Sequence, residues 1–365
     1  MELVGKKLLV AKKEELYFQK FTGKNGIDYG LRLGTTNDAG SISEIFEEIY
    51  GYQYVDPFVY DINLLKRELL NKNNFWFLGE VIENREITGA GLVEKKRYIA
   101  HAGKAVVRKK FQGLGVATKI AAAGIIALIK TPQFNDVLRI DSDVRGPMIR
   151  SQRLIQMAGA IPYALIPGYN NFADKRFFEI DDNKPFPPKK EESAFLYSII
   201  FKKLWKLRDK TVYLLDNNEN FIFFYDYVKT LSNKMNNDIL ILEKERNSKG
   251  YELYGVSKDH YNGIVKLYGY IKEKSLNNLI KNHKKWRIIL WRIPTTQNGI
   301  SSMALATKNG FKVVGYDIGF NNINWTLFDS IILAYYPQNI YNLLDIEALE
   351  ITKPMKNKIK ESFTN

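Results

Sequence analysis

The fold is decided by one stretch, Val106-Val107-Arg108-Lys109-Lys110-Phe111-Gln112-Gly113-Leu114-Gly115-Val116-Ala117-Thr118-Lys119-Ile120. It begins as a valine-rich strand, turns at two glycines and continues as an apolar helical pattern to about Lys130. The glycines allow a tight turn with exposed N–H groups, and the following helix adds the positive end of its dipole. The stretch therefore predicts a binding site for an anionic phosphate.

Two common phosphate-binding loops do not fit this stretch. A P-loop requires the pattern G-x-x-x-x-G-K-[ST], which does not occur here. A Rossmann turn requires a strand that runs directly into G-x-G-x-x-G. Here residues 108–112 separate the strand from Gly113, and Thr118 stands at the position of the third glycine.

The patterns around this stretch predict a mixed α+β sheet covered by helices, because helices come first, then an antiparallel meander, then a β-turn-α-β unit. A regular Rossmann alternation of strands and helices does not fit. The expected elements, by residue range, are a strand at 27–33, a helix after 38, a helix at 63–70, strands at 75–81, 86–93 and 102–107, a helix at 116–130, a strand at 136–141 and a helix at 151–159.

The second half is expected to form a separate domain. Three prolines and several charges near residues 183–192 cannot sustain a helix or a central strand, which predicts a first domain over 1–182, a linker over 183–208 and a second domain over 209–365. Beyond the linker we expect strands at 211–215, 221–225, 239–242, 251–254 and 286–291, helices at 275–284 and 301–308, and either type at 261–272. The endings 151–159 and 302–310 share a serine-bearing helix and a glycine, which indicates a distant internal repeat.

Composition excludes several classes of protein. The 365 residues include no cysteine, so disulfides, thiolate metal sites and a cysteine nucleophile are excluded. His101, His260 and His283 lie far apart in sequence, which argues against a histidine-built metal site. The apolar run at 120–129 is too short to span a membrane, and the charged N-terminus lacks a signal-peptide pattern, so we expect a cytoplasmic protein. The net charge of +14 attracts anions without choosing among nucleic acid, acidic lipid and a phosphorylated cofactor.

The glycine stretch resembles the signature Gln/Arg-x-x-Gly-x-Gly/Ala of the GCN5-related N-acetyltransferases (GNATs). The match consists of Gln112, Gly115 and Ala117 after the strand Val106-Val107. The hairpin near 76–93 resembles the central hairpin of that family, and Ser151 with Gly159 resembles its second motif. Two departures are Ala160, where a phenylalanine is usual, and Ile155, where many members carry the tyrosine acid.

The second half resembles the same fold in a degenerate form. Ser302 to Phe311 resembles the closing motif with its Gly-Phe intact, but no Gly-x-Gly occurs near 266–280. The resemblance covers about residues 27–180 well and 210–335 loosely, and implies one active module followed by a degenerate copy. Mycothiol synthase and N-myristoyltransferase are double modules of this kind, as analogies only.

The resemblance implies an acyl-CoA-dependent N-acyltransferase with acetyl-CoA as donor, an amine of a small molecule or a protein as acceptor, and no metal. A charged amine cannot attack a thioester, so a base or a water relay is needed. The expected catalytic residues are Asp141, Asp143 and Tyr163. The expected donor-binding residues are Val106, Val107, Arg108, Gln112, Gly113, Leu114, Gly115, Val116, Ala117, Thr118 and Ser151.

Two other functions stay open. The charge and aromatics such as Trp286 and Trp291 would suit a nucleic-acid-binding or regulatory protein that reuses the fold. A FemABX-type aminoacyl or peptidyl transferase also doubles this fold but uses charged tRNA, and the complete CoA-type loop argues against it.

Overall fold

The computed structural model describes residues 16–182, 190–216, 218–232, 235, 238–242 and 252–364. Contacts divide the chain into unit 1, which is Met1–Ser142 with Asp174–Arg176, and unit 2, which is Asp143–Ala173 with Phe177–Asn365. This division differs from the predicted limits of 1–182, 183–208 and 209–365, which stay a prediction. Residues 183–189 of the predicted linker lie outside the described residues.

Unit 1 is built on a mixed sheet. Its neighbouring strands pair antiparallel, except that β5 and β6 are parallel. This arrangement confirms the mixed sheet predicted from the sequence. In order across the sheet the strands are β1 (Gln19–Thr22), β2 (Asp28–Leu33), β3 (Asn74–Val81), β4 (Ile87–Lys96), β5 (Ile99–Val107) and β6 (Arg139–Arg145).

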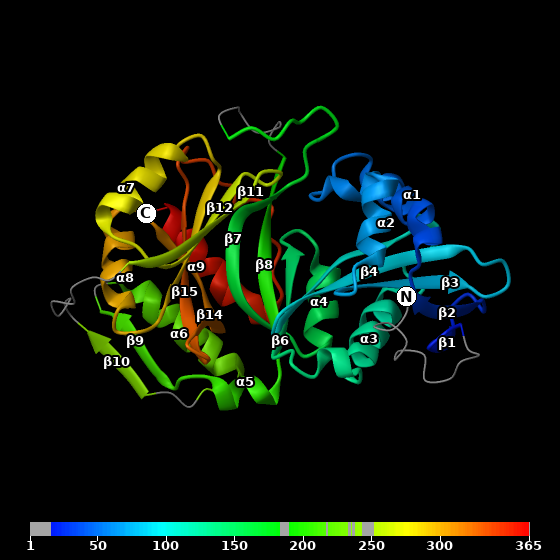
Figure 1. The fold of residues 1–365 in the computed structure, drawn as a ribbon, viewed down its shortest axis with the longest axis horizontal. Coiled ribbons are helices and arrows are strands. Elements are labelled where there is room, and N and C mark those ends of the chain that lie inside the picture. The colour runs from blue at the N-terminus through cyan, green and yellow to red at the C-terminus, as the bar shows by residue number, and fades with distance from the viewer. Residues whose placement is uncertain are drawn as a thin grey trace. The chain divides into compact units, whose positions relative to one another are not determined.

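Helices cover both faces of this sheet (Figure 1). One face carries α1 (Ala39–Tyr50) and α2 (Ile62–Leu70), and the other carries α3 (Val116–Ile129). Alternation along β3 explains the division, because successive side chains point to opposite faces. Asn74 donates a hydrogen bond to Glu68 of α2, whereas Phe77 lies against Gly124 of α3.

Within unit 2, neighbouring strands follow the order β8-β7-β14-β15-β13-β12-β11, and β9 and β10 form a separate parallel pair. Its strands are β7 (Ile161–Asn171), β8 (Glu191–Ile200), β9 (Thr211–Leu215), β10 (Asp238–Leu242), β11 (Leu253–Asp259), β12 (Ile264–Tyr270), β13 (Ile288–Pro294), β14 (Lys312–Ile323) and β15 (Thr326–Tyr335). Its helices are α4 (Ile149–Met157), α5 (Lys202–Leu207), α6 (Glu219–Ser232), α7 (Glu273–Asn282), α8 (Gly299–Lys308) and α9 (Lys353–Thr364).

One motif occurs twice in unit 2. The end of β6 leads through α4 into the hairpin β7–β8, and β13 leads through α8 into the hairpin β14–β15. Each helix is followed by a glycine of positive φ, Gly159 at 84° and Gly310 at 78°. In each case the second strand of the hairpin lies next to the strand that precedes the helix. Strand β15 pairs with β13. Arg145 of β6 donates a hydrogen bond to Glu192 of β8. The topology supports the repeat predicted from the two endings.

Three expectations were wrong. The range 221–225, predicted as a strand, lies within helix α6. The strand predicted at 136–141 is β6, displaced to Arg139–Arg145. Trp286 and Trp291, considered for base stacking, are 0% exposed and belong to the core.

The length and polarity of the helices bear on whether the chain can cross a membrane. In the part of the chain that the structure describes, the helices are too short or too polar to cross a bilayer.

Candidate functional site: the loop before α3 and the fork of β5 and β6

Three buried apolar residues fix the glycine loop on the sheet of unit 1. Phe111, Val116 and Ile120 are each at most 5% exposed. The ring of Phe111 lies edge-on to Tyr29, with centroids 6.1 Å apart. Because these anchors alternate with residues that remain outside, Gln112, Gly113, Ala117 and Thr118 are exposed to solvent.

The loop presents main-chain amides to solvent. Gly113 and Gly115 have φ of 80° and 87°, and a Cβ at either position would meet no atom within 4 Å. Within the described ranges, no hydrogen bond engages the amides of residues 113–118. The first turn of α3 contains no acidic residue. Free amides and an unopposed helix dipole are features that favour the binding of an anion.

Hydrogen bonds hold both ends of this loop. The Gln112 side chain donates from Nε2 to the carbonyl of Val107 at 3.0 Å, which ties the turn to the end of β5. The Arg108 guanidinium donates to Ile87 O at 3.0 Å and contacts Glu44 and Glu48 of α1 at 3.1 and 3.0 Å. These contacts make Arg108 a structural support of the loop.

Glu48 also binds the main chain of the loop. Its Oε1 accepts the Lys109 amide at 2.7 Å, while its Oε2 accepts from Arg108. Burial tends to raise the pKa of the Glu48 carboxyl, but these hydrogen bonds outweigh it and lower the pKa below its ordinary value. One carboxylate of α1 thus fixes two successive residues of the loop.

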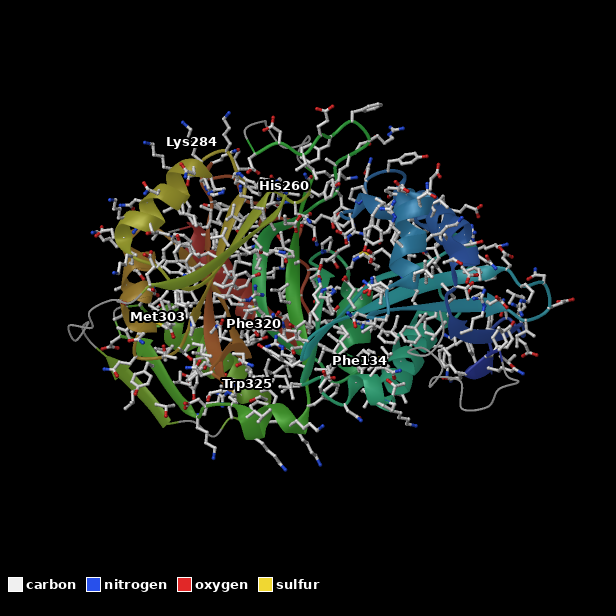
Figure 2. All side chains as sticks on the ribbon, in the orientation of Figure 1. Phe134, His260, Lys284, Met303, Phe320 and Trp325 are labelled. Atoms are coloured by element: carbon white, nitrogen blue, oxygen red, sulfur yellow. The ribbon has the colours of Figure 1, made fainter. Side chains whose placement is uncertain are left out.

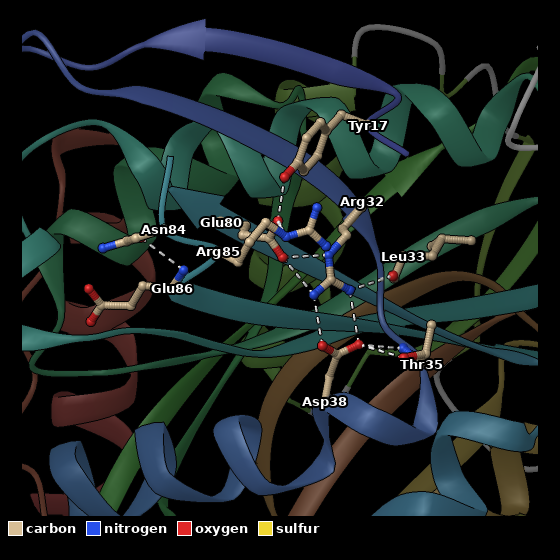
Figure 3. A network of polar contacts seen from close by, with 9 residues as sticks. All are labelled: Tyr17, Arg32, Leu33, Thr35, Asp38, Glu80, Asn84, Arg85 and Glu86. Carbon is tan, nitrogen blue, oxygen red and sulfur yellow. Dashed lines mark hydrogen bonds and ion pairs between the residues drawn. The ribbon is translucent and has the colours of Figure 1, made fainter. Parts of the chain in front are cut away.

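A buried ionic network holds the start of α1 (Figure 3). Arg32 of β2 donates to Asp38, the residue before α1, at 2.7 and 2.9 Å, and to Glu80 of β3 at 2.8 Å. Asp38 also accepts the Thr35 amide at 2.7 Å in a capping box, as the sequence indicated. Tyr17 donates to the second oxygen of Glu80. The network therefore fixes α1, and with it Glu48, on the sheet.

The parallel strands β5 and β6 part beside the loop. Their pairing register covers three pairs, from Ile99↔Arg139 to His101↔Asp141, although β5 continues to Val107. The register of β5 against β4 shifts just beyond that point, where Lys104 has φ of 52°. A bulge bends a strand and increases its twist. The strands thus diverge into a fork whose open side is continuous with the glycine loop.

The resemblance of the glycine stretch to the GCN5-related N-acetyltransferases implies an arrangement of this kind. An antiparallel meander, a forked parallel pair and a glycine loop opening the intervening helix occur here in the order that the sequence motif implied.

Among known proteins, similarity is found to solved structures over about half of this chain. No family model and no curated protein matches the chain. Among solved structures, it is similar to the ribosomal-protein-S5-alanine acetyltransferase of Vibrio fischeri, with 15% identity and a TM-score of 0.38 over 50% of this chain and 97% of that one. The acetyltransferase YncA of Salmonella typhimurium, determined with acetyl-CoA, has 14% identity and a TM-score of 0.37 over 47% and 93%. A spermidine N-acetyltransferase of Vibrio cholerae has 13% identity and a TM-score of 0.36 over 47% and 93%.

A row of titratable side chains crosses the fork of β5 and β6. His101 of β5 pairs with Glu94 of β4 on one side and with Asp141 of β6 on the other. Directly opposed residues on neighbouring strands share a face. The imidazole leans over Gly103, since Cε1 lies 3.1 Å and Nδ1 3.4 Å from the place of a Cβ there. The three side chains therefore share the face that α1 and α2 cover.

His101 is the site residue that sequence reasoning missed. The sequence shows only one histidine in a strand, and its spacing from His260 and His283 argued against a metal. Its position at the last pair before the fork depends on the register between β5 and β6, which a single sequence does not reveal. The available signal was a chemically active side chain five residues before Val106.

The predicted carboxylate Asp141 is engaged by a neighbour. It accepts from Arg139 Nε at 2.7 Å, and the Arg139 and Asp141 side chains are 0% and 13% exposed. Because both side chains are largely buried, this pair first serves the structure of β6. Asp141 nonetheless lies in the row at the fork, next to His101.

The other predicted residues belong to unit 2. Asp143 follows in β6, Ser151 is half-buried in α4, and Tyr163 is 4% exposed in β7. Of the loop lysines, Lys110 pairs with Glu86 at 2.6 Å, and Lys119 lies over the Phe21 ring. Unit 1 by itself thus brings together the predicted loop residues, Asp141 and the unpredicted His101.

Unit 2 contains a second β-α-β unit with a different junction. Only Ile271 and Lys272 separate β12 from α7, and α7 begins with Glu273. The Lys272 amide donates to Glu252 Oε1 at 3.1 Å. A hydrogen bond from Ser275, followed by that from Lys272, lowers the pKa of the Glu252 carboxyl. Carboxylates therefore already occupy the place where a phosphate would bind.

Proposed function

We propose that this chain is an acyl-CoA-dependent N-acyltransferase that transfers the acetyl group of acetyl-CoA to an amine. The observation that carries the proposal is the set of unengaged amides at residues 113–118, which open at the fork of β5 and β6. Those amides would bind the diphosphate of the donor, and the free edge of β5 from Ala102 to Val107 would bind its pantetheine arm. The acceptor is proposed to be a primary amine of a small molecule or a protein, in the cytoplasm.

We assign His101 as the general base. The uncharged acceptor nitrogen attacks the thioester carbonyl carbon, its proton passes to the imidazole, and the C–S bond breaks as the thiolate leaves with a proton. A neutral imidazole accepts a proton near pH 7. Main-chain amides at the fork would stabilise the negative charge that develops on the carbonyl oxygen.

Further side chains are proposed to contribute. Asp141 stands beside His101, where its charge favours the imidazolium that forms during the attack. Three residues of unit 2 remain proposed site residues. Asp143 is proposed for proton transfer, Ser151 for contact with the donor, and Tyr163 as the acid that protonates the thiolate. The repeated motif of unit 2 supports the proposal of a double module with domains 1–182 and 209–365, whose second copy has lost its donor loop.

Calorimetric titration of the purified chain with acetyl-CoA tests the proposal directly. We expect a dissociation constant of roughly 1 µM to 1 mM, the range typical of enzyme substrates. Adenosine 3′,5′-bisphosphate and pantetheine, used separately, are expected to bind more weakly than the whole donor. Absence of any heat or any competition by CoA would refute the proposed function.

Mass spectrometry then identifies the acceptor. A lysate or a panel of polyamines, amino acids and peptides is incubated with protein and labelled acetyl-CoA, and acetylated products are collected. The Gly115→Val variant serves as the matched control, because a branched side chain at positive φ disturbs the loop. Products that appear equally with this variant would show that the loop does not carry the activity.

A further inference from the structure

A tryptophan projects into solvent from the tip of the β14–β15 hairpin in unit 2 (Figure 2). Trp325 is 90% exposed. The hairpin closes through only Asn324 and Trp325, because Ile323 pairs with Thr326. Both turn residues have positive φ, 51° and 69°, as a type I′ turn requires.

The backbone at Trp325 is one that glycine adopts freely and that a bulky side chain disfavours. The turn is nevertheless held in place, since the Trp325 amide donates to Asn322 Oδ1 at 3.0 Å. A disfavoured residue kept in a well-formed turn suggests a role for its side chain. Here the side chain is an indole with both faces available to a ligand.

A group of lysines adjoins this hairpin. The main chain after α5 lies beside the start of β15. The Asp209 amide donates to Leu327 O at 2.8 Å, and Arg208 forms an isolated parallel β-bridge with Leu327. Leu327 is two residues from Trp325. What we call the Trp325 surface consists of the exposed side chains Trp325, Leu207, Lys202, Lys206 and Lys210.

Charged side chains next to the Trp325 surface are already engaged. The nearby Arg208 is neutralised by the buried carboxylate of Asp329, and Asp209 accepts the Thr211 amide at 2.8 Å. Over the described residues, Lys206 and Lys210 form no ion pair with an acidic side chain. An exposed aromatic face therefore stands beside an uncompensated positive charge.

We propose that the Trp325 surface binds single-stranded nucleic acid. A base would stack on the Trp325 indole while the lysines contact successive phosphates, a combination typical of sequence-tolerant binding. The net charge of +14 would speed encounter with such a polyanion. This function is separate from acyl transfer and uses no residue of the loop or the fork.

A membrane surface fits the same residues less well. Interfacial binding requires a helix with a broad apolar face. Helix α5 has six residues, and its Leu204 is buried within the protein. Leu207 and Trp325 are the large apolar side chains that this described surface exposes, too few to form such a face.

Fluorescence anisotropy with a labelled 20-nucleotide oligothymidylate tests the proposal across a series of salt concentrations. We expect the full-length chain to bind, with affinity falling steeply as salt rises. The Trp325→Gly variant is expected to bind at least about 10-fold more weakly. Its melting temperature should equal or exceed that of the wild type, because glycine adopts this turn without strain.

Charge variants separate stacking from phosphate contact. Lys206→Gln combined with Lys210→Gln is expected to reduce the salt slope by about 1.4, which corresponds to two phosphate contacts on a single strand. Lys274→Gln, an exposed lysine of α7, and Leu344→Ala, 95% exposed, are the controls and should leave binding unchanged. Equal losses in the Lys206/Lys210 and Lys274 variants would overturn the proposed surface.

Two other outcomes would overturn the proposal. One is oligonucleotide binding by Trp325→Gly that equals that of the wild type, or no binding by the wild type. The other is binding to phosphatidylserine vesicles that Trp325→Gly abolishes, without affinity for the oligonucleotide, which would make this a membrane surface. Acetyl transfer by Trp325→Gly is expected to match the wild type, so the two functions are tested independently.

Discussion

The two β-α-β units of this chain differ most at the start of the helix. Residues 108–115 form a loop between β5 and α3, in which no hydrogen bond of the described protein engages the amides of residues 113–115, and the first turn of α3 contains no acid. In unit 2 two residues connect β12 to α7, and Glu252 and Glu273 lie at the helix start. We propose that a helix N-terminus is not enough for a donor site, and that loop length and the absence of carboxylates decide which unit binds an anion.

The largest expected effect is a loss of kcat in unit 1 that has no counterpart in unit 2. His101→Gln should lower kcat by about 10²- to 10⁴-fold, because a general base is lost, and should leave the acetyl-CoA dissociation constant within about 2-fold. The matched variant is Tyr268→Phe, at the last β12–β13 pair, where we expect less than about 3-fold loss. Steady-state kinetics and calorimetry measure both. A comparable loss of kcat in Tyr268→Phe would contradict the proposed difference between the two units.

The second prediction concerns a variant in which the first turn of α3 is acidic, like that of α7. Ala117→Glu places a carboxylate in the exposed first turn of α3, as Glu273 does in α7. Repulsion between this charge and a bound diphosphate should weaken acetyl-CoA binding about 10- to 100-fold. The same charge favours the helix dipole by about 0.3–1 kcal/mol, so thermal stability should rise slightly.

The matched control for that variant is Ala117→Gln, which has the same size without the charge. Calorimetry and thermal melts of the two variants separate repulsion from bulk. Equal weakening by glutamine and glutamate would show that the first turn of α3 does not face the phosphates.

The third prediction concerns the support of the loop. Glu48→Ala removes the acceptor of the Lys109 amide and should raise the KM for acetyl-CoA about 3- to 10-fold, whereas Glu48→Gln keeps one acceptor and should lose less. Glu47→Gln, which loses only an exposed contact with Tyr52, is the control. An unchanged KM in Glu48→Ala would show that the loop is held without α1.

The pH dependence of this contact has a definite sign. The pKa of Glu48 is lower in the folded chain than its ordinary value. Its contribution to stability is therefore complete above that ordinary value and is lost as the pH falls through the lower, folded value. Acid melts should show a smaller loss of stability for Glu48→Gln than for the wild type, and parallel curves would contradict this assignment.

The smallest expected effect lies in unit 2. Glu252→Gln weakens the hydrogen bonds to Lys272 N and Ser275 and should lower Tm by about 1–2 °C. Acetyl-CoA binding should not change, because the two-residue connection provides no loop for a phosphate. Thermal melts and calorimetry measure the two quantities. A second acetyl-CoA site in this variant would show that the carboxylate alone kept α7 from binding.

Local patterns predicted most of unit 1. Alternation gave β2, the hairpin β3–β4 and the strand β5, while the capping box at Thr35 and Asp38 located the start of the first helix. The loop residues were predicted as well, because two glycines between a strand and a helix have a specific backbone use. Their role in donor binding stays a prediction.

Two errors have identifiable causes. The aromatic run at 221–225 suggested a strand, although Phe221, Phe224, Tyr225 and Val228 have the spacing of a helix face and are all 0% exposed. The prediction for β6 began too early because the buried apolar residues Val137 and Leu138 precede the strand. The pair that Arg139 and Asp141 form within it is visible only in the fold.

Long-range pairing explains the remainder. Neither the fork nor the row Glu94–His101–Asp141 can be predicted from local patterns, since both depend on which residues of β4, β5 and β6 stand opposite one another. The contact between α5 and β15 beside Trp325 joins segments more than 100 residues apart. Such pairings are properties of the assembled sheet.

The single carboxylate that joins α1 to the Lys109 amide has a thermodynamic consequence for two-substrate kinetics. If a ligand on the α1 face moves this helix, it must change the affinity of the loop for its own ligand, and linkage requires the reverse effect to be of equal size. Measuring how acceptor concentration alters the donor dissociation constant would therefore report on Glu48, and in Glu48→Ala that mutual influence should vanish.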